Sequence, residues 1–69
     1  MKGQYETAIE DCTEAIELDP DNVSAYLCRG LAYEKLGQSD QAIEDYETVL
    51  GLDPKNKDAK KALREIRKN

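Results

Sequence analysis

The sequence repeats itself at a fixed interval, and this repeat restricts the folds open to a chain of 69 residues. Residues 3–20 and residues 37–54 align without gaps at an offset of 34, and nine of the 18 aligned positions are identical. The identities include a Gly-Gln start, the tetrapeptide Ala-Ile-Glu-Asp and a closing Leu-Asp-Pro. A fixed period of this length is typical of proteins built by stacking one supersecondary unit.

The spacing of apolar residues within each period predicts helices. Residues 4–18 place apolar side chains one helical turn apart on a single face, and residues 40–53 carry the matching face. Two further helices are expected over about residues 22–36 and 57–68. No segment alternates apolar and polar residues as a half-buried strand does. The predicted fold class is therefore all-α.

Residues that end or begin helices divide the chain in the same way. Each Asp-Pro pair (residues 19–20 and 53–54) ends a helix, because the residue before proline is pushed out of the α region. Gly37 supplies the left-handed residue that ends the second helix. The expected N-caps are Asn22, Ser39 and Asn56. Links of two to five residues then require consecutive helices to pack antiparallel.

Gly30 lies in the middle of the second predicted helix, where glycine costs about 1 kcal/mol relative to alanine. A close contact with a neighbouring side chain would offset this cost. Tyr26, Gly30 and Tyr33 share one helical face, so we expect the tyrosines to flank a helix crossing at Gly30. This interpretation is favoured over a cofactor pocket, and no cofactor is expected.

Residues 23–56 resemble a tetratricopeptide repeat (TPR), a helix–turn–helix unit of 34 residues. The positions that carry the resemblance are Tyr26, Gly30, Tyr33, Gly37, Ala42, Tyr46 and Pro54, and Ala8 matches Ala42 in the first copy. Two positions depart from the family pattern. Val49 replaces a usual alanine, and Arg29 stands where leucine is usual. We expect the stem of Arg29 to pack while its charged head reaches water.

The resemblance implies antiparallel helix–turn–helix repeats in a single domain of about one and a half repeats, a TPR-type α-solenoid. Residues 3–20 would form the second helix of a truncated repeat, residues 23–56 a complete repeat, and residues 57–69 a C-terminal capping helix with a charged outer face. The chain is thus expected to be a C-terminal fragment of a longer array. The alternative is a self-assembling fragment with a structural role, which oligomerises through its open N-terminal face or swaps elements between copies by straightening the turn at residues 37–38. The residues expected to be uncovered at the N-terminal face are Tyr5, Ala8 and Cys12.

TPR proteins are scaffolds or adaptors whose first helices line a groove for a peptide or partner protein, and the resemblance implies the same function here. The implied groove residues are Ser24, Leu27, Cys28, Leu31 and Lys35 on one helix, and Asp58, Lys61 and Glu65 on the last. Leu27 and Leu31 lie on the face opposite the tyrosines. They would contact a partner or, alternatively, pack against an absent helix or a second copy.

Some TPR proteins are co-chaperones that hold the C-terminal carboxylate of a heat-shock protein with cationic and amide side chains. The matching positions here carry no cation: they hold Ser24, Leu27, Cys28 and Leu31, followed by Asp58 and Ala62. This segment is therefore not expected to form such a clamp. A co-chaperone role would require a clamp elsewhere in a parent protein.

Charge is divided unevenly along the chain, and this division limits the classes of partner that we expect. Residues 1–54 carry 13 acidic and three basic side chains, whereas residues 55–69 carry two acidic and seven basic ones. An acidic body disfavours nucleic acid and anionic membranes as partners. The basic tail is interpreted as a solvated helix, with an anionic partner as the weaker alternative. The longest apolar run is four residues, so no membrane span is expected.

Reactive residue types are sparse. The chain has no histidine, the usual general base at neutral pH, so no catalytic site and no enzyme activity are expected. Cys12 and Cys28 are the only cysteines, too few for a structural zinc site, and no metal is expected. Sequence alone leaves open whether they form a disulfide. Their positions in apolar stripes favour a reducing, cytoplasmic location.

Overall fold

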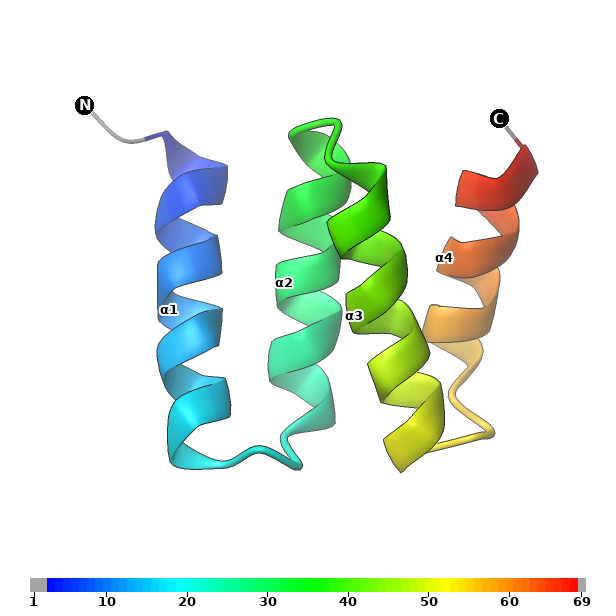
Figure 1. Ribbon diagram of the computed structural model, residues 1–69, viewed down its shortest axis with the longest axis horizontal. Coiled ribbons are helices and arrows are strands. Elements are labelled where there is room, and N and C mark those ends of the chain that lie inside the picture. The colour runs from blue at the N-terminus through cyan, green and yellow to red at the C-terminus, as the bar shows by residue number, and fades with distance from the viewer. Residues whose placement is uncertain (1–2, 69) are drawn as a thin grey trace.

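The computed structural model describes residues 3–68, which form four helices. These are α1 (Gln4–Leu18), α2 (Val23–Lys35), α3 (Ser39–Leu52) and α4 (Lys57–Lys68). Consecutive helices contact each other and alternate in direction (Figure 1). The Cα atoms span 34 × 29 × 15 Å, and the shortest extent corresponds to two layers of helices, because the Cα cylinder of one helix is about 4.6 Å across and packed helix axes lie about 8–10 Å apart. No strand occurs in the described part of the chain, and the predicted all-α class is confirmed.

Both Asp-Pro pairs end a helix as predicted. Asp19 (φ −147°, ψ 92°) and Asp53 (φ −141°, ψ 85°) leave the helical region. Their backbone N–H groups still close the last turn, donating to Ala15 O at 2.9 Å and to Val49 O at 2.6 Å. The proline that follows each aspartate prevents the helix from continuing.

The turn between α2 and α3 explains one wrong prediction. Gly37 adopts φ 78°, and the N–H of Gln38 donates to Tyr33 O at 2.9 Å, which is the Schellman pattern. Because this turn is so tight, the carbonyl of Gln38 already accepts the first α3 bond, from Ala42 N at 3.1 Å. Gln38 is therefore the N-cap, without a side-chain cap bond, and Ser39 is the first helical residue.

The other two predicted N-caps are confirmed. The side-chain oxygen of Asn22 accepts the N–H of Ala25 at 3.1 Å at the start of α2. The side-chain oxygen of Asn56 accepts the N–H of Ala59 at 2.9 Å at the start of α4. Each bond satisfies one of the backbone donors that a helix start leaves without an intrahelical partner.

The main core lies where α3 packs against α2 and α4. Its buried members are Ala42, Tyr46, Val49, Ala59 and Leu63. Gly30 of α2 lies directly against the Tyr46 ring: a Cβ added to Gly30 would be only 2.8 Å from Cε1 of Tyr46. The predicted helix crossing at Gly30 is therefore present, with Tyr46 of α3 inserted into it. Tyr26 and Tyr33 are half-buried and pack against this core.

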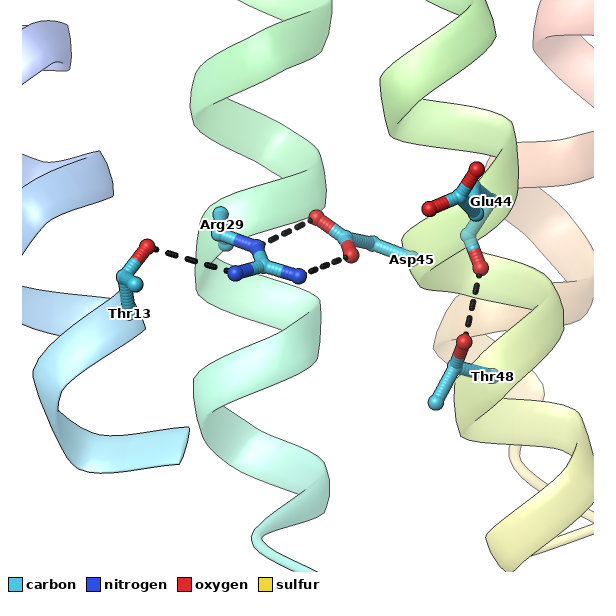
Figure 2. A network of polar contacts seen from close by, with 5 residues as sticks. All are labelled: Thr13, Arg29, Glu44, Asp45 and Thr48. Atoms are coloured by element: carbon cyan, nitrogen blue, oxygen red, sulfur yellow. Dashed lines mark hydrogen bonds and ion pairs between the residues drawn. The ribbon is translucent and has the colours of Figure 1, made fainter. Parts of the chain in front are cut away.

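The charged head of Arg29, which was expected to reach water, is bound to other side chains instead, and the Arg29 side chain is 19% exposed. Its Nε and one terminal nitrogen donate to the two carboxylate oxygens of Asp45 at 2.9 and 2.7 Å, and its other terminal nitrogen donates to Thr13 Oγ1 at 3.2 Å (Figure 2). The Asp45 side chain is only 3% exposed. The guanidinium carbon also lies 5.7 Å from the Tyr26 ring centre and 6.0 Å from that of Tyr33. Arg29 thus links α1, α2 and α3.

Cys12 is also less accessible than expected. It is 7% exposed because α2 packs over this part of α1. Burial and, second, the neighbouring Cys28 thiol raise the pKa of Cys12 to about 12. Both cysteines are free thiols. Of the other residues expected at the open face, Ala8 is half-buried and Tyr5 is 41% exposed.

Candidate functional site

A hollow of about 400 Å³ lies between α2 and α4. Its volume falls within the range of ligand pockets in proteins, about 300–1,000 Å³. Apolar side chains supply most of its wall, and Tyr46 of α3 lies at its base. The lining residues are Leu27, Cys28, Leu31, Tyr46, Asp58 and Ala62.

A second hollow of about 250 Å³ continues from the first along the same two helices. The two share Leu31, Tyr46, Asp58 and Ala62, so they form one groove, called here the α2–α4 groove. The residues that only the second hollow contains are all charged: Glu34, Lys35, Lys61 and Glu65. The groove is therefore apolar at one end and charged at the other.

Residue spacing on α2 and the small side chains beneath it create this groove. Leu27 and Leu31 lie four residues apart and so share a face of α2. Leu27 is half-buried against the core, whereas Leu31 is 51% exposed. Gly30 lets the Tyr46 ring approach α2 closely. On the opposite side, Ala62 fills little space and leaves the hollow open.

Hydrogen bonding fixes the base of the groove. The Tyr46 hydroxyl donates to a carboxylate oxygen of Glu34 at 2.9 Å. Burial and, second, this hydrogen bond hold the pKa of Tyr46 above its ordinary value. Tyr46 therefore remains a neutral donor at physiological pH, and the Glu34 carboxylate is held against the base of the groove.

Most of the groove residues expected from the resemblance lie in this groove. On α2 these are Leu27, Cys28, Leu31 and Lys35, and on α4 they are Asp58, Lys61 and Glu65. Ser24 is exposed in the first turn of α2, outside the residues that line either hollow.

Sequence reasoning missed Tyr46 and Glu34 as groove residues, whereas Ala62 stands at a position that matches the groove side of the family. Tyr46 was expected only as a packing residue, because an apolar residue on a helical stripe gives no sign of which neighbours it will have. Its place in the groove depends on how α3 docks onto α2, which local spacing does not encode.

Two kinds of feature are absent from residues 3–68. None of these helices is both long and apolar enough to cross a membrane. Within the same described segment, no three His, Cys, Asp or Glu side chains gather as they would to hold a metal ion.

Comparisons with known proteins agree with this architecture. A family model described as TPR repeat matches residues 1–37, and one described as Tetratricopeptide repeat matches residues 23–56. A comparison with curated proteins gave no match. Among solved structures, the TPR domain of Arabidopsis OM64 is 44% identical, with a TM-score of 0.91. The likeness covers 93% of this chain and 53% of that one, so the chain spans about half of that structure. The chain belongs to the tetratricopeptide repeat family.

Proposed function

We propose that this chain is a non-enzymatic protein–protein interaction module that binds a segment of another protein in the α2–α4 groove. TPR domains generally bind proteins or peptides, which supports the general function. The observation that carries the specific site is the apolar hollow of about 400 Å³, with the half-exposed Leu31 in its wall. Such a concave apolar surface on an exposed face is typical of a binding site.

The free energy of binding would come mainly from desolvation of the apolar end. An apolar side chain from the partner would remove Leu31, and what remains exposed of Leu27, from water at about 25 cal/mol per Å² of apolar surface. The Tyr46 ring beneath them is already fixed by packing and by its bond to Glu34. Little side-chain entropy would therefore be lost at the base of the groove.

A co-chaperone function through a carboxylate clamp is not supported by the residues of this segment. The two cations in the groove, Lys35 and Lys61, lie in its charged end together with Glu34 and Glu65. Asp58, which lines both hollows, would repel a carboxylate. Such a function would depend on residues elsewhere in a longer parent protein.

Two leucine substitutions test the proposed site. Peptides selected from a random displayed library against the chain would be labelled and their affinity measured by fluorescence anisotropy. We expect Leu31→Glu to weaken binding about tenfold or more, because it places a charge at the centre of the contact. The matched control is Leu52→Glu, since Leu52 is 40% exposed on α3 outside the groove. Equal affinities of the two variants would contradict the proposed site.

Self-assembly is the alternative function, and the exposed apolar residues of α1 support it. Leu18 is 83% exposed and Tyr5 is 41% exposed. If copies associate through these exposed residues, light scattering across a concentration series should show a rising mass, and Leu18→Glu should lower it. A constant monomer mass at the highest concentration would remove this alternative.

A further inference from the structure

We propose that the α2–α4 groove selects a partner segment in which an apolar residue stands next to a basic one. The apolar side chain would fill the hollow, and its cationic neighbour would pair with Asp58. This inference rests on the proposed function, because it specifies the chemistry of the segment that the groove binds.

Asp58 is the one charged side chain among the described residues that line the apolar hollow. Within residues 3–68 its carboxylate makes no ion pair with another side chain. Asp58 is exposed, so it would attract a cation with the modest strength of a surface ion pair and would repel an anion. The charge that a ligand presents near its apolar anchor should therefore be positive.

The start of α4 offers no compensating site for an anion. A free helix N-terminus attracts negative charge through its unpaired N–H groups and dipole. Here the Asn56 side chain already accepts the N–H of Ala59 at 2.9 Å. Asp58 adds a carboxylate within the first turn. An acidic ligand would consequently meet a helix end that is already capped and negatively charged.

The charged end of the groove does not reverse this preference for a basic ligand. Its own charged side chains are two lysines and two glutamates, so their formal charges cancel. These are Glu34, Lys35, Lys61 and Glu65. With Asp58 included, the described lining of the groove carries a formal charge of −1, and the excess acidic side chain is Asp58, which lines both hollows.

The composition of selected peptides tests this inference. A random nonapeptide library displayed on phage would be panned against the chain and, in parallel, against the variants Asp58→Lys and Asp40→Lys. Asp40 is the matched control, because it is an exposed acid in the first turn of α3 and lies outside the groove. Far-UV circular dichroism would verify that each variant is folded.

We expect peptides selected by the unsubstituted chain and by Asp40→Lys to carry Lys or Arg beside an apolar residue, and those selected by Asp58→Lys to lose this bias. For one selected basic peptide, the neutral variant Asp58→Asn should weaken binding about two- to fivefold, which corresponds to one exposed ion pair. If the selected peptides have an acidic bias or no charge bias, the inference is wrong, whereas the groove as the binding site is not contradicted. If panning against the unsubstituted chain enriches no peptide relative to a parallel panning against Leu31→Glu, the proposed function itself fails.

Discussion

Alanine substitution at two helical glycines isolates the effect of the contact at Gly30. Gly30 lies in the middle of α2 and Gly51 lies in the last turn of α3. Alanine is favoured over glycine by about 1 kcal/mol in a helix interior, and by about 0.5–1 kcal/mol nearer a helix end. A Cβ at Gly51 would have no neighbouring atom within 4 Å. Gly51→Ala should therefore stabilise the fold by about 0.5–1 kcal/mol.

The same methyl group at Gly30 meets the Tyr46 ring. The added Cβ would lie 2.8, 3.1 and 3.2 Å from three ring carbons, well inside the favourable carbon–carbon distance of about 3.5–4.0 Å. Tyr46 is 2% exposed and hydrogen-bonded to Glu34, so its ring has no free space to move into. Overpacking of this kind costs about 1–3 kcal/mol. After the helix-propensity gain, Gly30→Ala should be about 0–2 kcal/mol less stable than the unsubstituted chain.

The difference between the two variants is the quantity to measure. Urea unfolding followed by far-UV circular dichroism should place Gly30→Ala about 0.5–3 kcal/mol below Gly51→Ala. For a domain of this size the corresponding difference in Tm is at least about 2 °C. If Gly30→Ala stabilises the chain as much as Gly51→Ala does, the close contact between α2 and Tyr46 does not exist, and the described base of the groove is wrong.

Further predictions concern the buried ion pair and the thiols. Arg29→Leu should lower the free energy of unfolding in urea by about 3–5 kcal/mol, because it leaves the Asp45 carboxylate buried and unpaired. The double variant Arg29→Leu with Asp45→Leu should recover most of this loss. No recovery in the double variant would contradict the buried ion pair as the cause. Maleimide should label the exposed Cys28 rapidly and the buried Cys12 only after unfolding, as mass spectrometry of the labelled peptides would show. Because folding raises the pKa of Cys12 from 9.0 to about 12, its contribution to stability is complete below pH 9 and is lost as the pH rises towards 12. Burial also raises the pKa of Tyr46. Cys12→Ala should therefore reduce the loss of stability at alkaline pH without abolishing it.

The helices could be predicted from sequence because local residues set them. Proline, a left-handed glycine and asparagine caps act within one turn of their own positions. The second helix was expected over about residues 22–36 and occupies Val23–Lys35. The cap at Ser39 failed because the preceding turn places Gln38, one residue earlier, where the helix starts.

The polar core could not be predicted in this way. The tetrapeptide Ala-Ile-Glu-Asp occurs twice, yet Asp11 is exposed whereas Asp45 is 2% exposed and paired with Arg29. The same tetrapeptide thus has an exposed aspartate in one copy and a buried aspartate in the other, because the helix packed against each copy differs. The base of the groove is equally non-local, since Tyr46 of α3 reaches it only through the contact with Gly30 of α2.

The central claim is that a partner segment docks in the α2–α4 groove, and NMR mapping of a bound peptide tests this claim most directly. A library-selected peptide would be titrated into the ¹⁵N-labelled chain while backbone amide shifts are followed. The claim predicts the largest shifts at Leu27, Leu31 and Ala62, with little change at Ile9 and Leu18 of α1. Shifts concentrated on α1, with Leu31 and Ala62 unmoved, would contradict it.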